Sequence, residues 1–249
     1  MLLPEHGANP DFLLRSLKIN MGNERMADFS VNTNPFGPPK ALFEHWEEYQ
    51  KYVSLYPDPS SALLKEKIAC INGVKPDEVL VGNGAAELIY LLSSYLQRKR
   101  VLIVEPTFSE YRKSSESYDC HIDSVLLTAQ DDWQLDVLQI KEKIRTGRFA
   151  ALFLCHPNNP TGRIYNRELL LEILNEAERF GVKVIVDEAF YDFCTKDITV
   201  VPYIANFSQL IVLRSLTKIF SIPGLRLGYA IMNEKLAKRI AKRQHPWNV

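Results

Sequence analysis

Short apolar runs alternate along the chain with stretches whose apolar residues recur at helical spacing. Helical stretches at 85–96, 166–181 and 233–243 are the clearest, and Asn166 and Gly181 stand where a helix cap and a helix stop belong. Continuous apolar strands separated by helices are typical of an α/β fold with a mostly parallel sheet covered on both faces. The runs that predict strands are 79–82, 101–105, 150–155, 182–188 and 210–215.

Charge, hydropathy and cysteine spacing narrow the class of protein. Thirty basic residues balance thirty acidic ones, which indicates no nucleic-acid partner. The longest apolar run, 149–155, is far shorter than the roughly 20 residues that span a bilayer. The start of the chain lacks a signal-peptide pattern, and the cysteines have no metal-ligand spacing against the histidines. We therefore expect a cytoplasmic protein with free thiols, no metal and no membrane partner.

A glycine-rich turn, "GNGAAE" at 82–87, leads from the first strand into a helix. Its glycines allow a tight turn, and the free amides at the helix start suit a phosphate. Two glycines of a dinucleotide fingerprint are present, with Glu105 where a ribose-binding acid would fall, but Glu87 replaces the third glycine. Phosphate binding is the favoured interpretation. Dinucleotide binding and a plain turn are the alternatives.

Two later strand ends carry candidate ligand contacts. Phe108 follows the second strand, where its ring would stack on a flat heterocycle or simply join the core. The loop "HPNNPTG", 156–162, needs one asparagine for its turn, so the second is free to face a ligand. His156 has no metal partner or nucleophile near it in the sequence, and we assign it a structural role.

Charged residues lie at the end of, or shortly after, the last two predicted strands. Asp187 at the end of a buried strand needs a cationic partner, which a protonated pyridine nitrogen, a metal or an arginine would supply. A paired acid and base with Glu188 is disfavoured because adjacent strand residues point to opposite faces. Lys218, in "SLTKIFSIPGLRLGY" at 215–229, is either a solvated loop residue or a nucleophilic amine that an aldehyde cofactor can reach.

In this order the motifs resemble the fold-type I pyridoxal-phosphate enzymes, the aspartate aminotransferase superfamily, over essentially the whole chain. The resemblance implies that Lys218 binds the cofactor covalently, that Asp187 pairs with its ring nitrogen and that Phe108 stacks on the ring. Asn159 would donate to the phenolic oxygen of the cofactor. The cofactor phosphate would be held by Ala85, Ala86, Ser215 and Arg226, with Thr217 as an addition and Tyr56 reaching across a homodimer interface.

Within that superfamily the chain resembles the L-threonine-O-3-phosphate decarboxylases of cobalamin biosynthesis. The stretches that carry this resemblance are "HGAN", "DFSVNTNPFG", "DEAFYDF" and "PWNV"; Ala8 departs from the family's H-G-G-N. Residues 1–40 would form an arm that contributes to the substrate site, and residues 41–249 the cofactor-binding large domain. The implied reaction releases carbon dioxide from phosphothreonine and yields an aminopropanol phosphate. Substrate contacts would come from His6, Gly7, Asn32 and Asn159.

Other functions remain open at this point. Histidinol-phosphate aminotransferases share much of the pattern, but they commonly have Tyr where this chain has Phe190. A ligand sensor without turnover and a nucleotide-dependent oxidoreductase are the alternatives from other classes. The resemblance also implies that a small C-terminal domain, whose arginines grip the substrate, is missing here. We therefore expect this chain alone to be slow or inactive.

Overall fold

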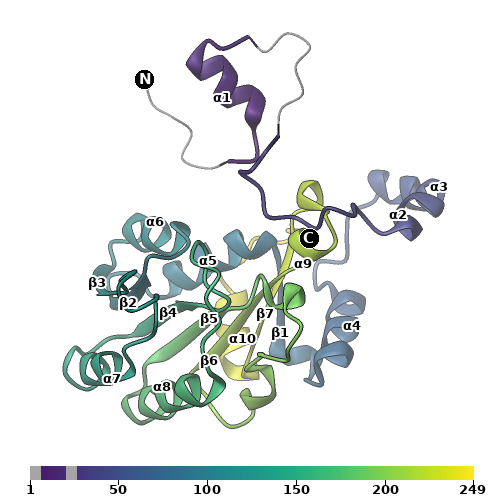
Figure 1. Cartoon of the computed structure of the whole chain (residues 1–249). Helices are drawn as coiled ribbons and strands as arrows, with labels where there is room; N and C mark the ends of the chain where they lie inside the picture. The colour runs from purple at the N-terminus through teal and green to yellow at the C-terminus, as the bar shows by residue number, and fades with distance from the viewer. Residues whose placement is uncertain (1–6, 21–26) are drawn as a thin grey trace.

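A seven-stranded sheet forms the centre of this computed structural model, which describes residues 7–20 and 27–249 (Figure 1). The strand order is β1-β7-β6-β5-β4-β2-β3. β7 runs antiparallel to both β1 and β6, and the other neighbouring pairs are parallel. The mostly parallel α/β sheet expected from the sequence is therefore confirmed. The strands are β1 Val79–Asn83, β2 Arg100–Glu105, β3 His121–Leu126, β4 Ala151–Cys155, β5 Lys183–Asp187, β6 Leu210–Ser215 and β7 Leu227–Met232.

Helices connect the strands, and one of them, α8, begins and ends at the cap and stop residues predicted from the sequence. The Asn166 side chain accepts from the Glu168 amide at 3.0 Å at the start of α8, and Gly181 ends that helix with a φ of 66°. Short 3-10 turns lie at Lys51–Ser54, Pro76–Glu78, Tyr191–Phe193, Val201–Tyr203 and Pro223–Leu225. The α-helices are α1 Pro10–Leu17, α2 Lys40–Glu44, α3 Trp46–Gln50, α4 Ala62–Asn72, α5 Gly84–Tyr95, α6 Glu110–Ser117, α7 Val137–Thr146, α8 Arg167–Phe180, α9 Leu216–Ile219 and α10 Glu234–Ala241.

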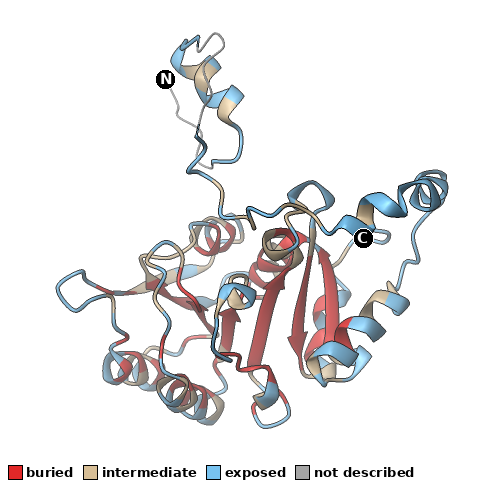
Figure 2. Cartoon of the chain, turned by 45° about the vertical axis from the view of Figure 1, so that its right-hand side comes forward, coloured by how far each residue is buried: buried red, intermediate tan, exposed pale blue. Residues whose placement is uncertain are grey.

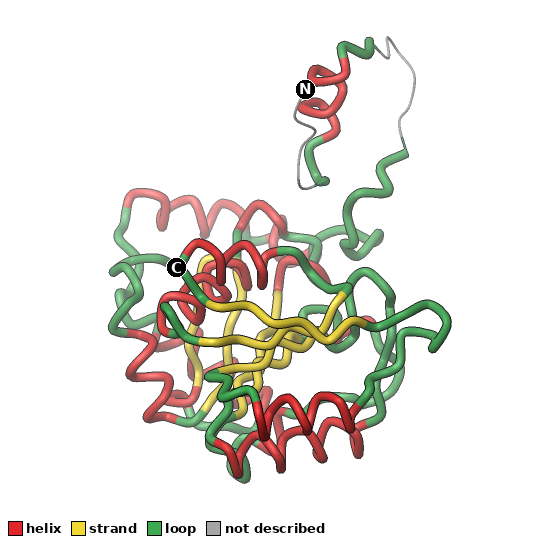
Figure 3. Tube along the Cα trace, turned by 90° about the vertical axis from the view of Figure 1, so that its left-hand side faces the viewer, coloured by secondary structure: helices red, strands yellow, loops and turns green. Residues whose placement is uncertain are grey.

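Helices cover both faces of the sheet, so the central strands are buried on both sides (Figures 2 and 3). One face packs on α5, α6 and α10, and alternate strand residues such as Phe153, Ile185 and Leu213 point into that layer. The other face packs on α4, α7 and α8. Side chains alternate between faces along a strand, which explains the continuous apolar runs. The N-terminal segment with α1 stands apart from these layers and is largely exposed (Figures 1 and 2).

The sequence patterns did not identify β3 and β7. β3 is an edge strand, "HIDSVL", whose polar residues interrupt the apolar run that marks a buried strand. The first three residues of β7, "LGYAIM", also belong to the lysine-containing stretch 215–229, and its glycine interrupts the apolar pattern of a buried strand. Both strands complete the sheet without changing its class.

β7 brings a third chain segment to the carboxyl edge of the parallel strands. Because β7 is antiparallel, it begins at that edge, and Gly228 pairs with Ser215 of β6 and with Gly82 of β1. A Cβ atom at Gly228 would lie 2.5 Å from the backbone nitrogen of Ala85. The start of α5 therefore sits directly on β7, at a distance that only glycine permits.

We expect Gly228→Ala to destabilise the protein by about 1–3 kcal/mol, since the added methyl group meets backbone that cannot move aside cheaply. Gly224→Ala is the matched control, because nothing lies within 4 Å of its Cβ position. Urea unfolding measures both changes in the free energy of unfolding. Equal stability of the two variants would show that α5 does not rest on β7 as described.

Candidate active site

The carboxyl edge of the sheet gathers most of the residues singled out in the sequence. β5 ends at Asp187 and β6 ends at Ser215, directly before the α9 turn that carries Lys218. Asp187 follows Ile185 in alternation, and it therefore points into the layer of α5 and α6. Cofactor and substrate sites of parallel sheets lie at this edge.

Asp187 is 4% exposed and is held by neutral donors. It accepts hydrogen bonds from the Tyr111 hydroxyl at 2.7 Å and from the Ala189 amide at 2.9 Å. Burial raises the pKa of the carboxyl, while the Tyr111 hydroxyl, the Ala189 amide and the charge of Lys218 oppose that rise. The sequence analysis did not identify Tyr111. Its spacing three residues after Phe108, on the first turn of α6, is the signal that was available.

Lys218 is half-buried on the α9 turn. Burial lowers the pKa of its amine, the positive charge of Arg226 lowers it further, and Asp187 acts in the opposite direction. A lowered pKa increases the fraction of free amine near neutral pH. The free amine is the form that attacks an aldehyde, so the surroundings of Lys218 favour a nucleophile over a solvated loop cation.

A cradle of hydrogen-bond donors, formed by Arg226, Ser215, Thr217 and the first amides of α5, lies where α5 begins. Gly84 has a φ of 76°, and a Cβ atom there would lie 2.6 Å from Nη2 of Arg226. The first amides of α5, including those of Ala85 and Ala86, have no carbonyl partner within the helix. Ser215 and Thr217 place their hydroxyl oxygens 2.8 Å apart. A guanidinium, helix-start amides and two hydroxyls together suit a phosphate.

The two asparagines of the 156–162 loop have different surroundings, as the sequence predicts: one stabilises the turn and the other lines a cavity. Asn158 is buried, and its side-chain nitrogen donates to the Pro106 carbonyl at 3.0 Å and to the Thr161 hydroxyl at 2.8 Å. Asn159 has no such side-chain bond to the described residues, and it lines a cavity of about 420 Å³. Asn32 lines the same cavity, as does Phe190. The structure thus brings two of the expected substrate contacts together.

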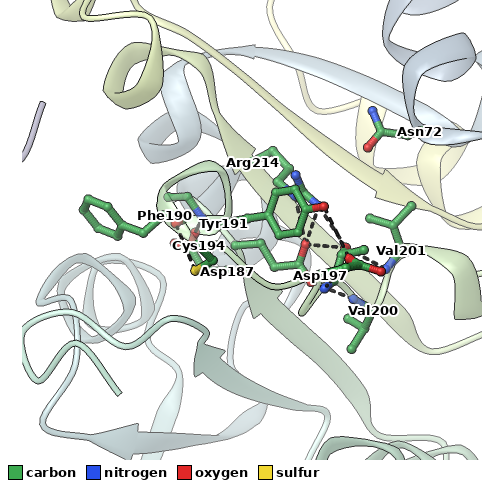
Figure 4. Close-up of polar contacts among 12 residues, drawn as sticks. Asn72, Asp187, Phe190, Tyr191, Cys194, Asp197, Val200, Val201 and Arg214 are labelled. Atoms are coloured by element: carbon green, nitrogen blue, oxygen red, sulfur yellow. Dashed lines mark hydrogen bonds and ion pairs between the residues drawn. The ribbon is translucent and has the colours of Figure 1, made fainter. Parts of the chain in front are cut away.

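Glu188 points to the opposite face from Asp187, which excludes the two as a joint acid and base. It is fully buried and forms an ion pair with Arg214 at 2.7 Å. Figure 4 labels Arg214 in this polar network, next to Tyr191. The Thr199 hydroxyl and the Val200 amide also donate to Glu188, at 2.7 and 2.8 Å. The Arg214 guanidinium lies over the ring of Tyr191, 3.7 Å from its centroid. Glu188 therefore has its compensating cation within the chain.

Some expected site residues lie elsewhere or have other neighbours. Phe108 is partly buried and meets the Tyr111 ring edge-on, with centroids 5.8 Å apart. Tyr56 is 84% exposed, with its ring 5.3 Å from that of Trp247. Gly7 lies against Ser30 within the N-terminal segment and does not line the cavity. His6 lies outside the described residues.

The contacts of Glu105 argue against dinucleotide binding, because that interpretation needs this carboxylate to bind a ribose. Glu105 accepts from the Arg112 guanidinium and from the Ser124 hydroxyl, so its carboxylate is engaged inside the fold. Glu87, at the place of the third glycine, accepts from the Asn83 amide. The described residues contain no cluster of side chains suited to a metal ion. None of the described helices is long and apolar enough to cross a membrane.

The fold is that of the large domain of the fold-type I pyridoxal-phosphate enzymes. A family model for aminotransferase class I and II matches residues 24–249, and the chain belongs to that family. The family uses pyridoxal 5′-phosphate, so the cofactor expected from the sequence is confirmed for the family.

Relatives divide between two activities. The chain is 35% identical over 232 residues to the threonine-phosphate decarboxylase of Salmonella typhimurium, covering 93% of this chain and 63% of the relative. It is 36% identical over 223 residues to the histidinol-phosphate aminotransferase of Caldanaerobacter subterraneus, covering 88% and 62%. The crystal structure of a histidinol-phosphate aminotransferase from Clostridium acetobutylicum matches with a TM-score of 0.83 and 32% identity, covering 90% and 66%. The chain thus spans less than two thirds of the length of these relatives.

His156, the first residue of the 156–162 loop, is packed inside the fold, in agreement with the structural role expected from the sequence. It is fully buried, stacks on the Tyr165 ring, and its Nδ1 accepts from the Tyr165 amide at 3.3 Å. Burial lowers the pKa of the imidazole from 6.5 to about 4. The ring is therefore neutral in the folded protein at neutral pH.

We expect this histidine to weaken the fold in acid. Between pH 6.5 and about 4 the unfolded chain binds a proton at His156 that the folded chain does not, so stability falls as the pH falls. The loss reaches about 3 kcal/mol near pH 4. Urea unfolding of wild type and His156→Gln across this range measures it, with a shallower pH slope expected for the variant. Parallel slopes would contradict the assignment.

Proposed function

We propose that this chain is the large domain of a pyridoxal-phosphate enzyme that decarboxylates L-threonine O-3-phosphate. The observation that carries the proposal is the grouping of Lys218, Asp187 and the α5 cradle at one sheet edge, with Asn32 and Asn159 on the adjoining cavity. When bound, pyridoxal phosphate supplies an aldehyde that reacts with amines and a ring that accepts the electron pair of a broken bond.

Each element of the site has a role that its surroundings support. Lys218 supplies the attacking amine, since its pKa is lowered. Asp187 presents a carboxylate whose described hydrogen-bond donors are neutral, and such a carboxylate favours a protonated ring nitrogen beside it. The cradle of Arg226, Ser215, Thr217 and the α5 amides binds the cofactor phosphate. Phe108 and Tyr56 complete the cofactor contacts expected from the resemblance, with Tyr56 contributed across a homodimer interface.

Phe190 supports decarboxylation over transamination. It lines the cavity with Asn159, and it has no hydroxyl with which to donate a second hydrogen bond toward the cofactor's phenolic oxygen. In this cofactor chemistry the bond perpendicular to the ring breaks, so groups that orient the substrate carboxylate choose the reaction. Asn32 and Asn159, which line the cavity, are the proposed substrate contacts with structural support. His6 and Gly7 are proposed from the resemblance alone, since Gly7 does not line the cavity and His6 lies outside the described residues.

Histidinol-phosphate aminotransferase is the second candidate. A relative with that activity is as similar as the decarboxylase, at 36% identity. The cavity also favours it in one respect, because its lining includes Phe190, Phe193 and Ile164 and no charged side chain among the described residues. A neutral, partly aromatic cavity would accept an imidazole ring.

Capture of the cofactor tests the first part of the proposal. The protein is incubated with pyridoxal phosphate, reduced with borohydride and digested, and the labelled peptide is identified by mass spectrometry. We expect the label on Lys218, because that amine combines a lowered pKa with the neighbouring phosphate cradle. Lys218→Arg should remove the label. A label on another lysine, such as the half-buried Lys183, would overturn the assignment.

Product analysis tests the second part, with Asp187→Asn as the matched variant. In a full-length protein that carries this large domain together with the substrate-gripping small domain, phosphothreonine should release carbon dioxide without a 2-oxo acid, while histidinol phosphate with 2-oxoglutarate should give little glutamate. Asp187→Asn should retain the borohydride label but turn over on the order of a hundredfold more slowly, the usual size of one lost electrostatic contact. Glutamate without carbon dioxide would favour the aminotransferase. Undiminished turnover by the variant would remove Asp187 from the mechanism.

A further inference from the structure

Asn34 joins the N-terminal segment to the turn that carries Lys218. Its backbone N–H donates to the Lys218 carbonyl at 3.0 Å, and its side-chain nitrogen donates to the Ile219 carbonyl at 2.9 Å. The α9 turn is only four residues long, so its carbonyls depend on partners outside the helix. Two of those partners come from a residue that is 184 positions away from Lys218 in sequence.

The other end of the Asn34 amide is also engaged. Its side-chain oxygen accepts from the Phe36 amide at 3.0 Å, and the Asn34 carbonyl accepts from the Gly37 amide at 3.4 Å. The side chain at position 34 therefore has to carry one hydrogen-bond donor and one acceptor at the same distance from the backbone. Asparagine supplies both, aspartate lacks the donor, and leucine of similar volume lacks both.

The segment that Asn34 holds also forms part of the cavity wall. Asn32, two residues earlier, lines the cavity together with Asn159. Residues 31–34 form no helix or strand, so their position depends on such tertiary contacts. Among the described residues, two hydrogen bonds join segment 27–39 to the sheet domain, and Asn34 donates both of them.

We infer that Asn34 is a positioning residue for Lys218, one that fixes the lysine turn and the Asn32 side of the cavity relative to each other. The catalytic meaning of this inference rests on the function proposed above for Lys218. The geometric part stands on the contacts alone. Asn34 has not been assigned any role by the sequence patterns, which drew attention only to Asn32 in the same stretch.

The amine of Lys218 gives a measurable readout of this role. Its neighbours are Arg226, whose charge lowers the pKa, and Asp187, whose charge raises it; burial is the largest cause of its lowered pKa. Loss of the Asn34 side-chain contacts should loosen the α9 turn and admit water to the amine. The pKa of Lys218 should then move upward, toward that of an exposed lysine.

Competitive acetylation of the cofactor-free protein, from about pH 6 to about pH 11, measures the labelling midpoint of each lysine by mass spectrometry. We expect the Lys218 midpoint of Asn34→Leu to rise by about half a pH unit or more. Asn175→Leu is the matched control, since Asn175 also donates to a backbone carbonyl, that of Leu171 at 2.8 Å, but lies exposed on α8. The control should leave the Lys218 midpoint unchanged.

A lower melting temperature of Asn34→Leu with an unchanged Lys218 midpoint would show a merely structural role and overturn the inference. If that variant does not fold, Asn34→Ala carries the same test with a smaller side chain. No cofactor is present in this experiment, so a failure of borohydride labelling at Lys218 would sink the proposed function while leaving the inference about Asn34 decided by its own measurement.

Discussion

Two consecutive carboxylates lie at the end of the buried strand β5 and just beyond it, and their charges are compensated in different ways. The pleat of β5 sends Asp187 and Glu188 to opposite faces. On the far face, Arg214 neutralises Glu188, and the loop at 199–200 wraps around the pair. On the near face, Asp187 has neutral hydrogen-bond donors and the charge of Lys218 as its nearest compensation. Asp187 forms no ion pair at contact distance with the described residues, and a buried carboxylate of this kind favours a cationic ligand group beside it.

The opposite directions taken by these neighbours were predictable, because they follow from the period of a strand. The same holds for the separate tasks of Asn158 and Asn159, which follow from the needs of a tight turn. Caps at Asn166 and Gly181 fixed the bounds of α8 for a local reason as well. Features that depend on residues close together in the sequence, such as side-chain direction along a strand and helix caps, were thus predicted correctly.

Features that depend on distant pairing were not predicted. Gly228 looks like any glycine before a strand, and only the register of β7 with β1 and β6 shows that α5 rests on it. Tyr111 lies on a helix without a distinctive pattern, yet its hydroxyl meets a carboxylate 76 residues away. Asn34 contacts a turn near the other end of the chain. In each case the cause is a tertiary contact, to which local periodicity is blind.

The segments that line the cavity are held to the rest of the protein by different numbers and kinds of contact. Cys194 and Thr195 belong to a loop that continues into the buried ion pair, so a change there disturbs a charge pair that is costly to break. Asn32 belongs to a segment tied down by a single asparagine. A substitution around Asn32 therefore alters the lining of the cavity and leaves the Glu188–Arg214 pair intact, so this part of the wall can change its chemistry with little effect on the buried core.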